Sequence, residues 1–146
     1  MKEIEKGIYF SSHTQDMDLQ IIYGFLKTTF WGKSRTFQEQ KLALENSINF
    51  GLFIKGKQVA YARVMTDKVF FAYLLDVFVL EEYRGKGLSK LLMDEILKNS
   101  ELKNVDKWML ATKDTHGLYK QYGFETVKNP LMLMEKMSDR AKKIYL

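Results

Sequence analysis

An apolar run that leads into a glycine-rich turn constrains the fold of this chain more than any other feature. Residues 69–80 are mostly β-branched, aromatic or leucine, which is typical of a central strand covered on both faces. The sequence Arg-Gly-Lys-Gly follows at 84–87, and apolar residues at helical spacing come after it. The stretch therefore predicts a buried strand, a loop and a helix over residues 86–98.

The turn also has the chemistry of a loop that binds phosphate. Gly85 and Gly87 let an anion approach the backbone without a Cβ atom in the way. The amide groups at the start of a helix are free to donate hydrogen bonds, and the helix dipole favours a negative charge there. Because Arg84 and Lys86 add positive charge, we expect a ligand that carries a pyrophosphate.

Length and composition limit the class of protein. A chain of 146 residues fits one domain with one core, so we expect a single domain over residues 1–146 that ends in a polar tail at 138–146. The absence of cysteine excludes disulfide bonds, thiolate zinc sites and a cysteine nucleophile. No apolar run approaches the ~20 residues that span a bilayer, and the charged N-terminus does not resemble a signal peptide. We therefore expect a cytoplasmic protein with no membrane partner.

The net charge of +5 makes a nucleic-acid partner a weaker hypothesis. The lysines are scattered along the chain and often stand beside acidic residues, which favours a solvated basic surface that binds no nucleic acid. A mildly positive field would also attract an anionic cofactor.

Hydrophobic periodicity and turn residues predict a mixed α/β sheet with one crossover unit, in which a helix connects two parallel strands. The crossover runs from the strand at 69–80 through the helix at 86–98 to a strand at 107–112. The other expected elements are a strand at 7–13, helices at 17–30, 37–48 and 115–122, a hairpin at 50–66 and a last strand at 131–136.

Two motifs in this arrangement resemble those of the GCN5-related N-acetyltransferases, the GNAT family. The family's acyl-CoA motif, Gln/Arg-x-x-Gly-x-Gly/Ala, matches Arg84 to Ser89, where Ser89 replaces the final glycine or alanine and adds a hydroxyl donor. The second feature, Leu-Tyr followed shortly by Gly-Phe, matches residues 118–124. The resemblance covers roughly residues 7–136 and is greatest to small, single-domain, bacterial-type members.

The resemblance implies a mostly antiparallel central sheet that is splayed between two of its strands and flanked by about four helices. It also implies an enzyme that moves the acetyl group of acetyl-CoA directly to a primary amine of a small molecule or peptide, without a metal. The strands at 69–80 and 107–112 would form a cleft in which the pantetheine arm bonds to the backbone of the sheet. The cofactor-binding residues that this implies are Phe78, Val79, Arg84, Gly85, Lys86, Gly87, Leu88 and Ser89.

Tyr119 and Asp76 are the candidate catalytic residues. A phenol has a pKa of about 10, and the resemblance places Tyr119 beside the acyl sulfur, where it could protonate the departing thiolate. The alternative is that Tyr119 packs its short helix against the core. Asp76 interrupts the buried strand at 69–80, where carboxylates are rare unless they are paired or functional. It could bind the substrate ammonium, draw a proton from it through water, or serve as a structural acid bonded to loop amides.

Trp31 and Tyr73 are the candidate residues of the acceptor pocket. The family shapes acceptor choice around its first two helices and the loop between them, and Trp31 lies in that loop. The identity of the amine stays open. His13 and His116 are far apart and have no acidic partner at ligand spacing, so no metal site is expected. The sequence is compatible with a homodimer.

Two other phosphate-binding motifs do not fit. The P-loop pattern is absent, and Lys90 stands where a Rossmann fingerprint needs a third small residue. The remaining alternative to an enzyme is a non-catalytic module of the same fold that holds acyl-CoA as a ligand. Tyr119 favours the enzyme, because a module without turnover does not need that phenol.

Overall fold

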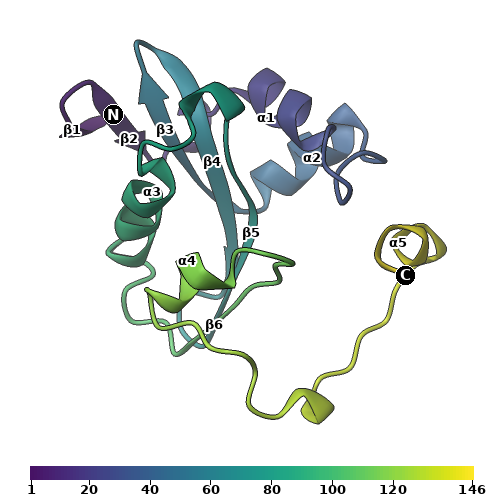
Figure 1. Ribbon diagram of the computed structural model, residues 1–146. Coiled ribbons are helices and arrows are strands. Elements are labelled where there is room, and N and C mark those ends of the chain that lie inside the picture. Colours follow the sequence, from purple (N-terminus) through teal and green to yellow (C-terminus); the bar gives the residue numbers. More distant parts are fainter.

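A six-stranded sheet forms the centre of the computed structural model, which describes residues 1–146 (Figure 1). The strands lie in the sheet in chain order, and all neighbouring pairs are antiparallel except β5 and β6. This confirms the predicted mixed, mostly antiparallel α/β sheet. The strands are β1 (Lys2–Glu5), β2 (Ile8–Ser11), β3 (Ile48–Ile54), β4 (Lys57–Thr66), β5 (Phe71–Val79) and β6 (Lys107–Met109).

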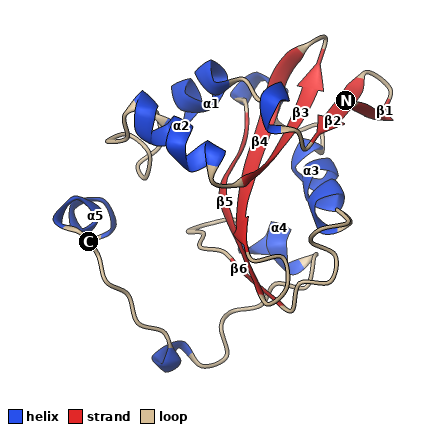
Figure 2. Ribbon diagram, turned by 180° about the vertical axis from the view of Figure 1, so that it is seen from behind, coloured by secondary structure: helices blue, strands red, loops and turns tan.

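Helices cover both faces of the sheet (Figures 1 and 2). Side chains of α1 and α2 pack on one face, and side chains of α3 and α4 belong to the larger core on the other face. A fifth helix, α5, ends the chain at a distance from the sheet (Figure 1). The helices are α1 (Leu19–Leu26), α2 (Phe37–Glu45), α3 (Leu88–Leu97), α4 (His116–Lys120) and α5 (Asp139–Tyr145).

The central strands contribute to both cores in alternation. In β4, Ala60 and Ala62 belong to the larger core with α3, whereas Tyr61 between them belongs to the smaller core with α1 and α2. In β5, Val79 belongs to the larger core and Phe78 belongs to the smaller one. Successive side chains of a strand point to opposite faces, so a strand covered on both sides has to be apolar at nearly every position.

The two strands of the crossover unit share only a short stretch of pairing. Of β5, only Phe71–Tyr73 pairs with β6, and the remainder pairs with β4 alone. The register between β4 and β5 shifts at a bulge, where Asp76 has a φ of +54°. Bulges bend a strand and increase its twist. The later part of β5 therefore has a free edge on the side of β6, which confirms the splayed sheet.

The C-terminal part of the chain departs from the prediction. The expected strand at 131–136 does not form: a 3-10 turn at Pro130–Met132 is followed by an extended stretch that leads to α5 (Figures 1 and 2). The apolar residues there satisfy the local requirement of a strand, but no strand of this chain pairs with them. The tail expected at 138–146 forms α5, because the Ser138 hydroxyl caps the helix.

The predicted helices at 17–30, 37–48 and 115–122 form with shorter bounds, and two further differences concern strands at the two ends of the sheet. β1 was not predicted, and its Lys2 forms an ion pair of 3.1 Å with Glu95 of α3. β6 ends at Met109, before the predicted end at residue 112.

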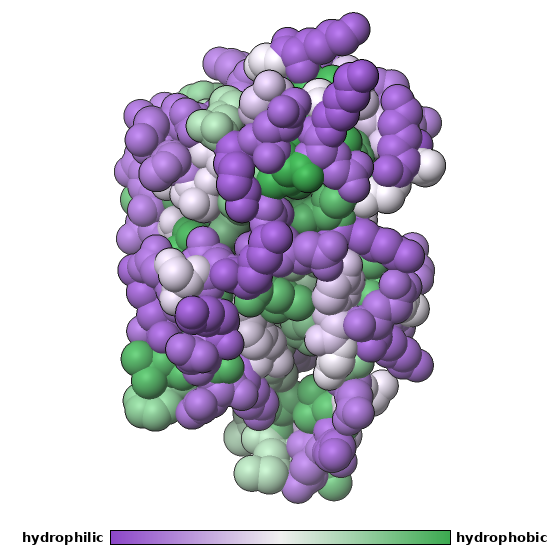
Figure 3. All heavy atoms as spheres, turned by 90° about the vertical axis from the view of Figure 1, so that its left-hand side faces the viewer, coloured by the Kyte–Doolittle hydropathy of each residue, from purple (hydrophilic) through white to green (hydrophobic).

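The surface on the α3 side of the molecule is mostly hydrophilic, and hydrophobic residues form only small groups there (Figure 3). None of the helices combines the length and apolar character that crossing a bilayer requires.

Candidate functional site

The turn between β5 and α3 has the backbone of an open, glycine-dependent loop. Gly85 and Gly87 have φ values of +79° and +75°, in the left-handed region that side chains strain. A Cβ atom added to either residue would have no atom within 4 Å. The glycines therefore serve the left-handed conformation and leave the space in front of the loop free.

The first turn of α3 presents amide groups to this space. Gly87 is the N-cap residue, and no side chain accepts a hydrogen bond from the first turn. The N–H groups of Leu88, Ser89 and Lys90 have no acceptor within the helix, because intrahelical bonding begins with the Leu91 amide. A helix start of this kind carries partial positive charge.

A cavity of about 280 Å³ lies at this helix start and brings most of the predicted cofactor-binding residues together. Lys86 and Phe78 are not among its lining residues. The Lys86 ammonium lies 5.5 Å from the centre of the Tyr83 ring, and Phe78 is buried and stacks on Phe25 at 4.2 Å. The residues that line the cavity are Val79, Tyr83, Arg84, Gly85, Gly87, Leu88, Ser89, Lys90 and Leu118.

Arg84 joins the loop to the end of β5. Its Nε–H donates a hydrogen bond of 3.1 Å to the carbonyl of Val79, and its guanidinium lies 6.0 Å from the ring centre of Phe25. The guanidinium is thus held at the junction between strand and loop, where it contributes positive charge.

The short helix α4 lies beside the first turn of α3 and carries Tyr119. The hydroxyl of Tyr122, two residues beyond the end of α4, donates a hydrogen bond of 3.1 Å to the carbonyl of Lys90 in α3. Tyr119 is 7% exposed and meets the ring of Phe124 edge-on at 5.9 Å. Burial raises the pKa of Tyr119 above its ordinary value, so the phenol keeps its proton at neutral pH.

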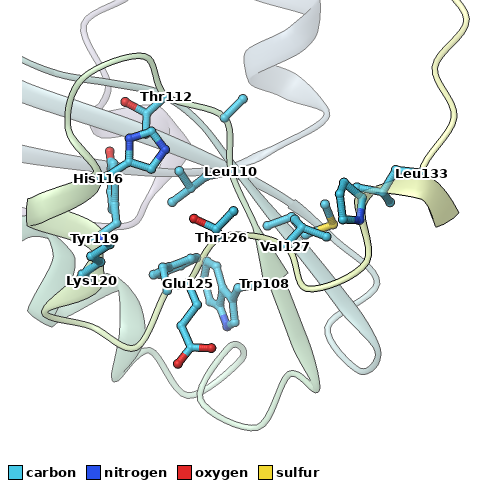
Figure 4. A pocket seen from close by; sticks show the side chains of 14 residues that line it. Trp108, Leu110, Thr112, His116, Tyr119, Lys120, Glu125, Thr126, Val127 and Leu133 are labelled. Carbon is cyan, nitrogen blue, oxygen red and sulfur yellow. The ribbon is translucent and has the colours of Figure 1, made fainter.

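A second cavity, of about 340 Å³, lies on the other side of Tyr119 (Figure 4). His116, Tyr119 and Lys120 of α4 stand at one end of it, and Leu133 stands at the other (Figure 4). Leu118 lines the cavity at the start of α3, and Tyr119 lines this second one. The helix α4 therefore separates the two spaces. We call this second cavity the β6 groove, since residues 108–112 form one of its walls.

Asp76 forms a buried ion-pair network. Its Oδ2 accepts hydrogen bonds from Arg63 Nε at 2.7 Å and from Arg35 Nη1 at 2.9 Å, and its Oδ1 accepts one from Trp31 Nε1 at 3.1 Å. The side chain is 1% exposed. Burial acts to raise the pKa of Asp76, but the charges and hydrogen bonds of Arg63 and Arg35 outweigh it and hold the pKa below the ordinary value.

This network makes Asp76 a weak base. Both carboxylate oxygens already accept hydrogen bonds, and the lowered pKa reduces the affinity of the carboxylate for a proton. The geometry agrees with the interpretation of Asp76 as a structural acid, although its hydrogen-bond partners are side chains and not loop amides. Arg63 could have indicated this ion pair from the sequence, because a cation inside an apolar strand requires an acidic partner.

The predicted acceptor residues Trp31 and Tyr73 lie near an aromatic group contributed by several segments. Phe30 meets the ring of Trp31 at 5.2 Å and the ring of Tyr145 of α5 at 6.4 Å, both edge-on. The Lys113 ammonium, from the loop before α4, lies 4.1 Å from the centre of the Phe30 ring. Burial, and then the nearby phenol of Tyr145, raise the pKa of Tyr73. Sequence reasoning missed Lys113 and Tyr145, because both lie far along the chain from Phe30, the residue that they contact.

Comparison with known proteins agrees with the two motifs. The model of the acetyltransferase (GNAT) domain matches residues 44–126. The uncharacterized N-acetyltransferase ycf52 of Pyropia yezoensis is 30% identical over 133 residues, which cover 86% of this chain and 73% of that protein.

Solved structures show the same fold. A protein of Xanthomonas campestris pv. campestris, described as belonging to the GNAT family, is 41% identical with a TM-score of 0.87, over 90% of this chain and 93% of that one. A protein of Clostridium acetobutylicum, solved with acetyl-CoA, is 15% identical with a TM-score of 0.62, over 88% of this chain and 99% of that one.

The domain match extends over more than half of the chain, and it includes β3, β4, β5, the glycine loop, α3 and α4. The two relatives at 30% and 41% identity extend over most of the remainder. The chain therefore belongs to the GNAT family of acetyltransferases.

Proposed function

We propose that the protein is an N-acetyltransferase that moves the acetyl group of acetyl-CoA to a primary amine of a small molecule or peptide. The observation that carries this proposal is the uncapped start of α3 behind two left-handed glycines, with a protonated phenol on the adjacent helix. The structure solved with acetyl-CoA, which shares the fold, supports the same donor.

The loop fits a pyrophosphate. The free amide groups of Leu88, Ser89 and Lys90 would donate hydrogen bonds to its oxygens, and the open space before Gly85 and Gly87 gives the anion room. The free edge of β5, which ends in Phe78 and Val79, would hold the pantetheine arm through backbone hydrogen bonds.

The thioester is already activated, so the protein has to hold two reactants together and protonate the leaving group. The amine nitrogen attacks the thioester carbonyl carbon, the C–S bond breaks, and the Tyr119 hydroxyl gives its proton to the departing sulfur. The substrate ammonium loses one proton to water before the attack, and the second proton, which the nitrogen loses as the amide forms, returns through water to the Tyr119 phenolate. Tyr119 suits this role because its raised pKa keeps it protonated.

We assign Asp76 a positioning role in place of the base role. It ties Trp31 and Arg35, which belong to the segment between α1 and α2, to the middle of β5. In this arrangement the part of the cleft that would bind the amine is attached to the same strand as the part that would bind acetyl-CoA.

We expect Gly87→Val to abolish the rise in melting temperature that acetyl-CoA produces. In the wild type, a ligand that binds only the folded state at 100 times its Kd stabilises it by about 2.7 kcal/mol. The valine side chain would enter the phosphate space and strain the loop. Gly56→Val is the matched control, since Gly56 also has a left-handed φ, of +77°, and open space around it. Loss of the ligand shift in both variants, or in neither, would contradict the loop assignment.

Tyr119→Phe should lower kcat by about a hundredfold to ten-thousandfold and leave acetyl-CoA affinity nearly unchanged, because only proton donation is lost. Steady-state kinetics with an accepted amine and calorimetry with acetyl-CoA measure the two quantities. Tyr9→Phe, at a half-exposed tyrosine of β2, is the control and should behave as the wild type. An unchanged kcat in Tyr119→Phe would remove the acid role.

Asp76→Asn should destabilise the protein by about 3–5 kcal/mol at pH 7, because it leaves two arginines without their anion. The folded pKa of Asp76 is lowered, so its contribution is complete above the unfolded value of about 3.9 and is lost as the pH falls below it. The difference between variant and wild type in denaturant unfolding should therefore shrink in acid. Equal stability at pH 7, with a loss of kcat alone, would favour the base role.

A further inference from the structure

The ion-pair network around Asp76 carries more positive charge than negative charge. Asp76 is its one carboxylate, and it pairs with two arginines, Arg63 at 2.7 Å and Arg35 at 2.9 Å. Neither arginine forms an ion pair with any other carboxylate of the chain. A positive charge held away from water is costly unless an opposite charge lies beside it. One further anion would therefore balance this network.

The network also has more hydrogen-bond donors than acceptors. Arg35 uses only its Nη1, which donates to Asp76 and to the side-chain oxygen of Gln40, whereas its Nε and Nη2 have no acceptor. The amide nitrogen of Gln40 is the only buried side-chain polar atom of the protein without a hydrogen-bond partner. A carboxylate or phosphate accepts hydrogen bonds and an ammonium only donates them, so the surplus of donors favours an anion.

Arg35 is the member of the network that a ligand can reach. Its side chain is 21% exposed, compared with 10% for Arg63 and 1% for Asp76. A guanidinium presents its N–H groups in a planar fork that pairs with both oxygens of a carboxylate or phosphate. Because Asp76 holds Nη1, the fork formed by Nε and Nη2 is fixed in direction and free to bind.

The network connects through two aromatic rings to the loop before α4. Trp31, which also donates to Asp76, meets the ring of Phe30 at 5.2 Å, and the Lys113 ammonium lies 4.1 Å from the centre of that ring. Lys113 follows the wall of the β6 groove and leads into α4, the helix that carries Tyr119. A second cation therefore lies near Arg35, on the segment that positions the proposed acid.

We propose that the amine acceptor also carries an acidic group, a carboxylate or a phosphate, and that Arg35 binds this group. The statement rests on the proposed function, because it names the class of amine that receives the acetyl group. The ammonium end of such a molecule would point away from Arg35, since like charges repel and both groups only donate hydrogen bonds. Asp76 would serve this binding indirectly, by holding the guanidinium in place.

Acetylation of matched amine pairs tests the substrate class. The members of each pair differ only in the acidic group: amino acids against their amides, and phosphoethanolamine against ethanolamine. The acidic member should have a kcat/KM higher by about tenfold to a hundredfold, the size of a hydrogen bond to a charged group. A preference in the first set alone identifies a carboxylate, and a preference in the second alone identifies a phosphate. Equal use of both members, or a preference for the neutral member, would overturn the proposal.

Arg35→Gln tests whether this residue binds the acidic group. The variant should fold, because Arg63 and Trp31 still donate to Asp76. It should remove the preference within each pair, mainly through a higher KM for the acidic amine, and Arg35→Lys should recover part of it. Lys41→Gln, at an exposed lysine of α2, removes the same charge and is the matched control that should keep the preference. A preference that survives in Arg35→Gln would overturn the assignment.

Melting temperatures separate the failure of this substrate class from the failure of the proposed function. With coenzyme A present, acidic amines should raise the melting temperature of the wild type and not that of Arg35→Gln. Acidic amines that neither raise it nor react would overturn the substrate class, whereas the shift with acetyl-CoA alone tests the donor. Acidic amines that bind through Arg35 without being acetylated would support the anion site and contradict the acetyl transfer.

Discussion

The left-handed turn at the end of β5 is the constraint on which the site depends. Gly85 and Gly87 reverse the backbone without side chains, so α3 begins with its amide groups directed at open space. The same helix buries Leu92 and Ile96 in the larger core, which fixes its direction. The packing energy of the core thus holds in place a set of hydrogen-bond donors that have no partner within the protein.

β5 connects the two sides of the proposed cleft. Its end leads into the glycine loop, and its middle carries the bulge at Asp76. A positive φ at a residue other than glycine costs of the order of 1–3 kcal/mol, and the ion pairs with Arg35 and Arg63 offset that cost. The bulge lies beyond the stretch of β5 that pairs with β6, and it carries a carboxylate that bonds to the segment between α1 and α2. The glycine loop and the segment between α1 and α2 are therefore both attached to this strand.

Local sequence patterns predicted the strand, loop and helix that position the site. They did not predict side-chain contacts between residues that lie far apart in the sequence. The strand at 69–80, the glycine turn and the following helix were all recognisable, because apolar periodicity and glycine have direct backbone consequences. The partners of Asp76 are 13 and 41 residues away, so no local pattern identifies them. Residues 131–136 show the limit most clearly: their composition indicates a strand, but a strand also requires a neighbour with free backbone groups, and composition does not supply one.

Backbone amide NMR during titration with coenzyme A tests the central claim most directly, since each donor of the loop has its own signal. The account predicts that the largest shift changes occur at Gly85, Gly87, Leu88, Ser89 and Lys90, and that they saturate together with a single affinity. Saturable binding that leaves these amides unperturbed, with the largest changes elsewhere in the chain, would contradict the assignment of the pyrophosphate to the start of α3.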